Sequence, residues 1–354
     1  MKRSVLVTLI IASFIIGFST TTPAFDYDGP TVKWRFGMTG SPRIGTYAVD
    51  WFAKEVEKRT DGKMKVSVQY GGVLASQNQA RDAIKSGIMD GGQVRITKIG
   101  NTPLGTVCGL PCLCLPDTAK VEDVCEWITR IYTHPLMVEE WSKRWKNKYF
   151  FPIVFTPRGI ASNVKITKLS EFDGLRFRES KVKGQPFAGL GAVLTWVSTG
   201  DLYSAMERKM IDAAAYPCPS SMVAVGLGEV SKYVLHHLDY SYSFNTFAVN
   251  ENKYNNLPAP IKKVVDEVVA EIPQFLAEDN TRRIEEDWKK LTEKGVEKIE
   301  ASPEFRAGLK ELAAKTYPKW VDNVVKKGGV SRENAEQVLQ MVKDVTDEIS
   351  SRYK

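Results

Sequence analysis

Two arginines in the middle of the chain have the residue type and the setting to bind an anion. Arg158 follows the apolar run Phe151–Phe155, and Arg178 ends the strand-like segment Gly174–Arg178. Open α/β sheets place ligand groups at the carboxyl ends of their strands, and the planar donor fork of arginine suits a carboxylate. The sequence therefore predicts a carboxylate site. The alternative is that both arginines are solvated strand ends, because arginine is mostly exposed in proteins.

Metal and nucleophilic chemistry find little support in the sequence. The three histidines, at 134, 236 and 237, stand apart from the cysteines, and no zinc-binding spacing is present. A Cys-His nucleophile pair has no local signature, and the Gly-x-Ser-x-Gly elbow of a hydrolase is absent. We therefore expect no metal, no cofactor and no catalytic residue.

The five cysteines are an odd number for an exported protein. Cys112 and Cys114 are too close in sequence to pair easily with each other. Cys108 or Cys125 could pair with one of them, and Cys218 is the fifth cysteine. The sequence leaves the disulfide pairing open.

The first 24 residues have the pattern of a signal peptide. Lys2 and Arg3 precede an apolar stretch, Val5–Phe18, which is short for a membrane span, and Thr22–Ala24 offers small residues for cleavage. We expect cleavage near Ala24 and a periplasmic protein. An uncleaved anchor is the alternative.

Charge and composition describe a globular chain without a nucleic-acid site. The 354 residues, 43% of them hydrophobic and 26% charged, suggest two domains. Without Lys2 and Arg3 the chain keeps 47 basic and 42 acidic residues, a mild net charge of +5. Because these charges are interspersed and no basic stripe carries aromatic residues, we expect no nucleic-acid partner.

The N-terminal half alternates strand and helix signals. Expected strands at Val32–Met38, Lys63–Tyr70 and Ile88–Val94 are separated by helical patterns at Tyr47–Arg59 and Gln77–Ser86. This order predicts an α/β domain with a largely parallel sheet.

A short internal echo suggests a second lobe of similar build. Ala83–Gly92 and Ala205–Ala214 each read as a helix end, two apolar residues, an aspartate and two small residues. We therefore expect two α/β lobes with a ligand cleft between them, since clefts between lobes are favoured ligand sites.

The last hundred residues are predicted to be helical. Ile261–Ile272 carries a buried-face stripe, Pro273 should kink or split the helix, and the pattern resumes as far as Glu293. As one unit, this helix could bridge both lobes. Further helices are expected at Pro303–Lys315, Pro318–Lys327 and Arg332–Ser350. Their charged faces are read as solvated, with a partner-binding face or a dimer as the alternative.

Several of these segments together resemble the solute-binding proteins of TRAP transporters, of the dicarboxylate-binding DctP type. The resemblance covers about Val32 to Pro258. The segments that carry it are Phe36-Gly37-Met38, Phe52–Val56, Asp61-Gly62-Lys63, Gly71-Gly72, Leu74, Gly87, Asp90, Gly174–Arg178, Gly191-Ala192, Asp201–Ala205 and Ile211-Asp212.

The resemblance implies a periplasmic-binding-protein-like receptor whose two lobes close on an organic acid and which then docks on a gradient-driven membrane permease. Its implied lobes are residues 25–155 with about 242–281, and residues 156–241 with about 282–330, followed by a C-terminal helix at 331–354.

The resemblance also implies roles for individual residues. Arg178 falls where the family arginine pairs with the ligand carboxylate, and Arg158 where many members keep a second arginine. Tyr216 replaces a common asparagine and Thr199 a common aromatic residue, while Trp196 is unusual nearby. Arg95 and Thr39 fall on positions that face the pocket from the first lobe. Trp196 and Tyr216 would offer flat contact to an aromatic or bulky acid, although Trp196 as a core residue is the alternative.

Three other functions remain open at this point. A binding protein of an ATP-driven importer or a chemosensor would have similar pocket chemistry. An exported hydrolase would need a nucleophile with a base in reach. A scaffold would bind protein through the C-terminal helices.

Overall fold

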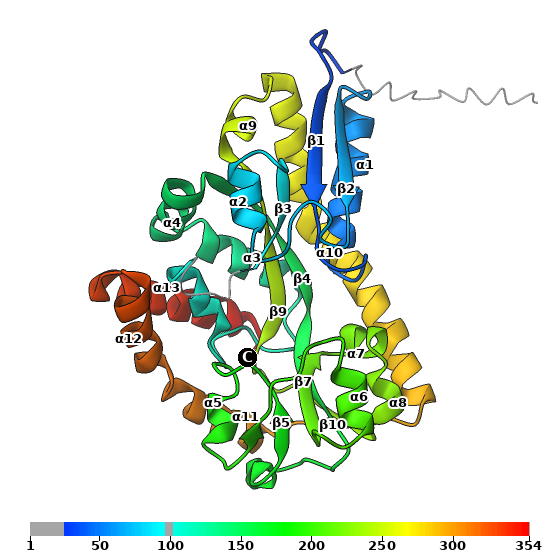
Figure 1. The fold of residues 1–354 in the computed structure, drawn as a ribbon, viewed down its shortest axis with the longest axis vertical. Helices are drawn as coiled ribbons and strands as arrows, with labels where there is room; N and C mark the ends of the chain where they lie inside the picture. Colours follow the sequence, from blue (N-terminus) through cyan, green and yellow to red (C-terminus); the bar gives the residue numbers. More distant parts are fainter. Residues whose placement is uncertain (1–24, 96–101, 354) are drawn as a thin grey trace, which may run out of the picture.

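A computed structural model of the chain describes residues 25–95 and 102–353 (Figure 1). The expected signal peptide, residues 1–24, lies outside the described residues. The strands are β1 Val32–Gly37, β2 Met64–Gln69, β3 Gly91–Val94, β4 Asn147–Ser162, β5 Arg176–Arg178, β6 Val193–Leu194, β7 Ala213–Pro217, β8 Tyr233–His236, β9 Tyr242–Asn250 and β10 Glu297–Glu300. The α-helices are α1 Tyr47–Arg59, α2 Ala80–Lys85, α3 Val121–Tyr132, α4 Pro135–Trp145, α5 Gln185–Ala188, α6 Leu202–Glu207, α7 Ser220–Ala224, α8 Leu227–Val230, α9 Glu251–Asn255, α10 Ala259–Glu293, α11 Pro303–Ala314, α12 Tyr317–Gly328 and α13 Arg332–Ser350. Short 3₁₀ turns cover Leu104–Gly109, Leu169–Phe172 and Ser351–Tyr353.

The strands form two mixed sheets, one in each lobe, joined through β4. Their order along the hydrogen-bonded path is β2-β1-β3-β9-β4-β7-β5-β6, with β8 and β10 branching from β4. The pairs β1-β2, β1-β3, β5-β6 and β5-β7 are parallel, as the sequence predicts. The pairs β3-β9, β9-β4 and β4-β7 are antiparallel. The prediction of a largely parallel sheet is therefore right only within each unit.

Strand β4 is the main connection between the lobes. It pairs with β9 in the first lobe and continues to pair with β7 and β8 in the second. A register shift between Val154 and Pro157 marks the crossing point. Arg158 therefore lies inside a 16-residue strand and not at the end of a short one, which corrects the expectation from sequence.

Helix α10 bridges both lobes as one 35-residue unit (Figure 1). Pro273 lies inside it without splitting it. Its first half contributes to the core of the first lobe as far as Leu276, and Leu291 joins a core of the second. Between them, the buried Asn280 donates from Nδ2 to the carbonyl oxygens of Val154 at 3.0 Å and Phe155 at 3.3 Å. The helix is thus fastened to β4 at the crossing point.

The described part of the chain contains three hydrophobic cores. One large core serves the first lobe, and two smaller ones lie on opposite faces of the second sheet. Successive strand residues point to opposite faces, so Ala213 and Ala215 join one small core and Ala214 the other. Helices α12 and α13 pack into the large core. We therefore propose that both belong to the first lobe, in place of the expected boundary at 330.

The internal echo corresponds to a repeated piece of structure. In the first lobe the Asp90 N–H donates to the Arg35 carbonyl oxygen at 2.8 Å, and the Asp90 carboxylate accepts from the Arg35 N–H. In the second lobe Arg176 and Asp212 repeat both contacts, at 2.9 and 3.0 Å. Each aspartate thus ties the start of one strand to its parallel neighbour.

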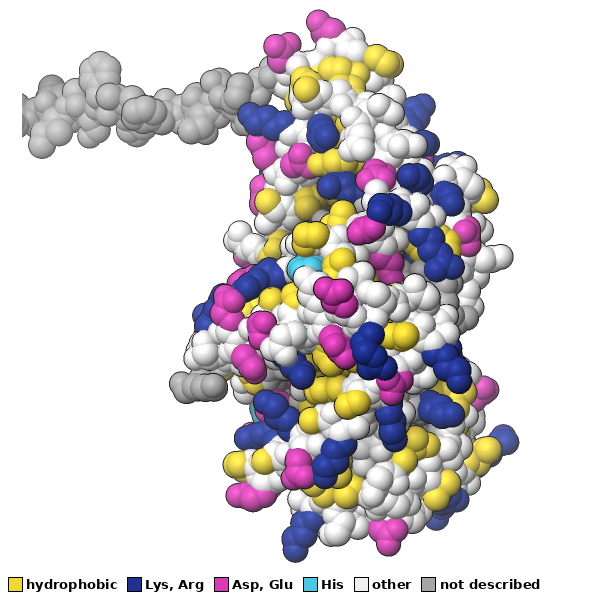
Figure 2. Space-filling view, turned by 90° about the vertical axis from the view of Figure 1, so that its left-hand side faces the viewer, with side chains coloured by type: hydrophobic (Ala, Val, Ile, Leu, Met, Phe, Trp, Pro, Cys, Tyr) yellow, Lys and Arg dark blue, Asp and Glu magenta, His cyan; other side chains and the backbone are white. Residues whose placement is uncertain are grey.

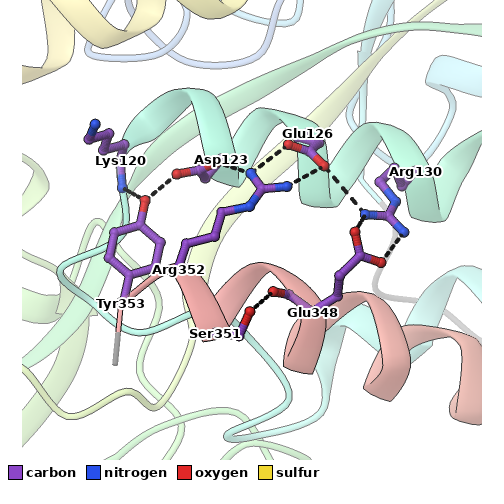
Figure 3. Close-up of polar contacts among 8 residues, drawn as sticks. All are labelled: Lys120, Asp123, Glu126, Arg130, Glu348, Ser351, Arg352 and Tyr353. Carbon is purple, nitrogen blue, oxygen red and sulfur yellow. Dashed lines mark hydrogen bonds and ion pairs between the residues drawn. The ribbon is translucent and has the colours of Figure 1, made fainter.

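The end of the chain is held against α3 by alternating charges (Figure 3). Arg352 contacts Asp123 and Glu126, and Arg130 joins Glu126 to Glu348. Exposed pairs of this kind contribute little individually. Together they connect the residues around the end of α13 to α3.

The surface and the thiols agree with a globular protein. Figure 2 shows Lys and Arg side chains interspersed with Asp and Glu over one face. No helix in the described part of the chain is long and apolar enough to span a membrane. All five cysteines lie in the described ranges and are free thiols, so none of the pairings considered from sequence is present.

Candidate functional site

Arg178 ends β5 and is buried, with 5% of its surface exposed. Its Nε donates to the carbonyl oxygen of Val197 at 3.1 Å, and Nη1 donates to that of Ala215 at 3.3 Å. Nη2 has no hydrogen-bond partner among residues 25–95 and 102–353. The alternative of a solvated strand end is therefore wrong for Arg178, which keeps unused donors on a fixed guanidinium.

Two aromatic rings lie against this guanidinium. The central carbon of Arg178 is 4.8 Å from the ring centre of Trp196 and 5.5 Å from that of Tyr216. Trp196 is 68% exposed, so it is not a core residue. The Tyr216 hydroxyl donates to Oγ1 of the exposed Thr199 at 3.4 Å. The structure thus brings together Arg178, Trp196, Tyr216 and Thr199.

Arg158 lies beside Arg178 but is already partnered. Its Nη2 donates to the Ala215 carbonyl oxygen at 2.7 Å, and its Nε and Nη2 lie 3.1 and 3.0 Å from Oε2 of Glu179. The Glu179 side chain is 2% exposed and that of Arg158 is 11% exposed. Nη1 is less firmly held, 3.4 Å from Ser243 Oγ. One edge of Arg158 therefore serves the fold.

Thr39 and Arg95 approach from the first lobe. Thr39 follows β1, and both its N–H and its hydroxyl donate to Oε1 of the buried Gln93, at 3.2 and 2.9 Å. Arg95 directly follows β3, and its carbonyl oxygen accepts from the buried Arg81 at 2.9 Å. Its own guanidinium makes no hydrogen bond in the described part of the chain. Within the described residues, Arg95 is thus a cation without a hydrogen-bond partner on an anchored backbone.

Arg43 is a further cation that the sequence analysis missed. Its guanidinium lies 5.3 Å from the ring centre of Phe155 and donates through Nη1 to the carbonyl oxygens of Thr39 and Ser41 at 3.1 and 2.8 Å. The loop that carries it packs on β4 at Gly45. That glycine has φ +78°, and a Cβ there would lie 2.4 Å from the carbonyl oxygen of Val154.

The arginines influence one another across the lobes. Burial lowers the pKa of Arg178, and the charge of Arg158 lowers it further. Arg95 is exposed, but the protein around it partly desolvates its guanidinium and lowers its pKa. Tyr216 opposes this shift, and the charge of Arg158 adds to it. Burial also lowers the pKa of Arg43, with Tyr216 opposing that shift and Arg95 adding to it. The arginines therefore act on one another electrostatically, and Tyr216 influences Arg43, Arg95 and Arg178.

A lysine adds to the same positive region. Lys183 donates to Ser241 Oγ at 2.5 Å. Burial and the charge of Arg158 lower the pKa of Lys183 to about 8, against the influence of Glu179. The sequence signal for Glu179 is its place directly after Arg178, whereas Lys183 and Arg43 have no signal that distinguishes them from the other lysines and arginines of the sequence.

No described group of three or more His, Cys, Asp or Glu side chains is placed to hold a metal ion. The site contains charged hydrogen-bond donors beside aromatic rings. Such a set suits an organic anion, because charge-assisted hydrogen bonds to carboxylates are the strong ones.

Comparison with known proteins gives relatives of one kind. The family model for bacterial extracellular solute-binding proteins, family 7, matches residues 39–323. A solute-binding protein of Verminephrobacter eiseniae is 26% identical over 224 residues, 60% of this chain and 62% of that protein's length. The monocarboxylate 2-oxoacid-binding periplasmic protein of a Nostoc species is 23% identical over 281 residues, 74% of this chain and 73% of that protein.

Solved structures share the fold. DctP7 of Bordetella pertussis, a receptor that binds pyroglutamic acid, has a TM-score of 0.69 at 20% identity and covers 88% of this chain and 100% of its own. A TRAP periplasmic solute-binding protein of Desulfovibrio salexigens, in an open complex, has a TM-score of 0.75 at 19% identity and covers 90% and 96%. The shared fold, with two lobes and a long bridging helix, agrees with the family match. The chain belongs to family 7 of the bacterial extracellular solute-binding proteins.

Proposed function

We propose that the protein is an extracytoplasmic receptor that binds an organic acid between its lobes and delivers it to a gradient-driven TRAP membrane permease. The observation that carries this proposal is the unused edge of Arg178, a buried arginine at a strand end with two rings beside it. A ligand carboxylate would accept from Nη1 and Nη2 of Arg178. The family match, and the acids named for its relatives, support the same class of ligand.

Arg178 would supply orientation and charge, and the rest of the cleft would supply further affinity. A hydrogen bond to a charged group contributes about 1.5–3 kcal/mol net, whereas micromolar affinity needs about 8 kcal/mol. Contact with Trp196 and Tyr216 and closure of the lobes would add the remainder. Bending would occur at the β4 crossing, where a register shift already interrupts the pairing.

The aromatic rings favour a flat acid. A carboxylate bound edge-on to Arg178 would lie near the rings of Trp196 and Tyr216, so a conjugated or aromatic acid would gain stacking contact there. Thr199, which accepts from the Tyr216 hydroxyl, would fix the angle of that ring. Thr39 would contribute a hydroxyl from the opposite lobe.

Location and assembly follow from the same proposal. Cleavage near Ala24 would release the receptor into the periplasm. The permease would recognise the closed form. A hydrolase is not favoured, because the family is a class of solute-binding receptors and the site lacks a nucleophile-base pair in the described residues. A binding protein of an ATP-driven importer or a chemosensor is not favoured either, because the family match and the solved relatives are TRAP-type receptors. A homodimer stays a prediction.

A thermal-unfolding screen tests the proposal. The purified protein would be heated with aliphatic and aromatic acids, and with the neutral amide of each acid as its control. A ligand at a hundredfold excess over its dissociation constant stabilises the fold by about 2.7 kcal/mol, so we expect a rise of several degrees with one class of acid and none with its amides. Equal shifts with acids and amides, or no shift with any acid, would contradict the proposal.

A further inference from the structure

Lys183 lies in the turn between β5 and α5, where the second lobe meets a strand of the first. Its Nζ donates to Ser241 Oγ at 2.5 Å, and its carbonyl oxygen accepts from the Tyr240 hydroxyl at 2.5 Å. Ser241 is 2% exposed and Tyr240 is 0% exposed, and both directly precede β9 of the first-lobe sheet. The main chain and the side chain of Lys183 are therefore both held at the junction of the lobes.

This lysine forms no ion pair within residues 25–95 and 102–353. Glu179 is already engaged, since its Oε2 lies 3.0 Å from Nη2 of Arg158 and its Oε1 accepts from the Ser180 N–H at 2.5 Å. The carbonyl oxygen of Ser241, the residue that holds the Nζ, accepts from the Arg158 N–H at 2.9 Å. Lys183 is thus a cation near Arg158 whose side-chain partner is a neutral hydroxyl.

The charge of this lysine depends on its surroundings. The titratable groups around it come from both lobes and are Arg158 on β4, Glu179 after β5, Tyr240 before β9, and Cys108 and Cys114, which pack in the core of the first lobe. Burial raises the pKa values of both thiols and of the tyrosine, so these three groups are neutral at physiological pH. The pKa of Lys183 itself lies at about 8, so a further charge placed nearby would alter its protonation.

A ligand carboxylate on Arg178 would supply such a charge. Arg158 and Arg178 donate to the same carbonyl oxygen, that of Ala215, at 2.7 and 3.3 Å. The charge of Arg158 acts on both Arg178 and Lys183, so the three groups are within electrostatic range of one another. A negative charge nearby favours the protonated form of a lysine. By reciprocity, the protonated lysine favours the bound anion by the same factor.

We propose that Lys183 is a further cation of the anion site, which acts on the ligand through its charge, and that a neutral Lys183 takes up a proton from solvent when the acid binds. This inference rests on the proposed function and deepens it by naming how the affinity of that site is regulated. Affinity should be constant where Lys183 is already charged. It should fall as the pH rises through about 8, because the acid then binds only with uptake of a proton.

Calorimetric titrations of the parent protein with pyroglutamate, pyruvate and benzoate test this pH dependence. Carboxyl groups titrate near about pH 4, so each probe keeps one negative charge throughout. For the tightest of the three, we expect equal affinity at about pH 6 and 7 and a loss of about three- to tenfold by about pH 9.5, since one pKa unit corresponds to a factor of ten. Titrations near the pKa in Tris and in triethanolamine, cationic buffers with different ionisation enthalpies, should show uptake of a fraction of a proton.

Two substitutions separate the charge of Lys183 from its contacts. Lys183→Arg stays charged at every pH used, so its affinity should remain near the neutral-pH value of the parent, without proton uptake. Lys183→Gln is never charged, so it should bind at every pH as weakly as the parent does in alkali. Lys181→Gln, an exposed lysine in the same turn, is the control and should behave as the parent does. A purely structural role would lower affinity without changing its pH dependence.

Two kinds of result would overturn the inference, and they are distinguishable. If the parent affinity does not change with pH, or if proton uptake persists in either Lys183 variant, another group such as Asp117 is responsible or none is, although the receptor proposal stands. If neither these three acids nor any acid of the thermal screen binds at neutral pH, the receptor proposal fails along with it. The buffer comparison on the parent needs no substitution, so the test does not depend on how the variants fold.

Discussion

Arg158 and Arg178 donate to one acceptor, the carbonyl oxygen of Ala215, at 2.7 and 3.3 Å. Two guanidinium groups this close repel each other, and the arrangement persists because Glu179 neutralises one of them. Arg158 is therefore engaged by the Glu179 carboxylate, whereas Arg178 can bind a ligand.

Glu179→Gln should destabilise the protein strongly. Removing one partner of a buried ion pair leaves an uncompensated charge and costs about 3–5 kcal/mol, and both side chains here are nearly buried. The free energy of unfolding from urea titration measures this loss. Glu271→Gln breaks the more exposed pair with Arg59 and should cost less than about 1 kcal/mol. Equal effects of the two variants would show that the Arg158 pair is not important for the fold.

Asn280→Ala should weaken the junction between α10 and β4. The substitution leaves the buried carbonyl oxygens of Val154 and Phe155 without this donor, and an unsatisfied buried polar group costs about 1–3 kcal/mol. Hydrogen exchange should also become faster around the β4 crossing. Gln274→Ala, on an exposed face of the same helix, is the control and should change neither measurement. An unaltered exchange rate in Asn280→Ala would contradict a hinge role for this contact.

Several elements could be predicted from sequence because their signals are local. Tyr47–Arg59 and Arg332–Ser350 were expected with the bounds that the structure has, since an apolar stripe and clear end signals define each helix. The position of Arg178 at a strand end was also predicted, because the strand-like segment Gly174–Arg178 ends there.

Other features depend on contacts between distant segments. Strand β4 passes through Pro152 and Pro157, residues that argue against a central strand, and its length is set by pairing with β9, β7 and β8. Arg43 became a candidate only because its loop folds onto Phe155. The exposure of Trp196 likewise could not be predicted from its apolar character.

Stability should fall as pH rises from about 4 to 8, through Asp117. Burial and the charge of the neighbouring Asp239 together raise the pKa of this carboxyl to about 8, against N–H donors including that of Leu238. Between the unfolded and folded pKa values the native state keeps a proton that the unfolded state has lost, so the free energy of unfolding decreases with pH, by up to about 1.4 kcal/mol per unit.

Urea titrations at several pH values, on the protein and on Asp117→Asn, measure this slope. The variant should lose part of the decline. Glu140, whose pKa burial raises to about 7, should account for another part. Asp344→Asn, an exposed substitution on α13, is the control. A slope that is identical in Asp117→Asn and the parent would refute the assignment.

The thiols should react slowly in the folded protein. Burial raises the pKa of Cys108 to about 12 and raises those of the other four as well. Little thiolate is therefore present at neutral pH, and access is restricted. A colorimetric thiol reagent should label the native chain slowly and all five cysteines after denaturation. Fewer than five reactive thiols in denaturant would mean that a disulfide forms.

The most direct test of the central claim is the affinity of Arg178→Gln for the acid that gives the largest thermal shift. Calorimetric titration should show a loss of at least about a hundredfold, since two charge-assisted hydrogen bonds would be removed. Arg176→Gln, two residues earlier on the same strand and paired with Asp212 at an exposed position, should bind as the parent does. If Arg178→Gln keeps the parent affinity, Arg178 does not bind the carboxylate and the site lies elsewhere in the cleft.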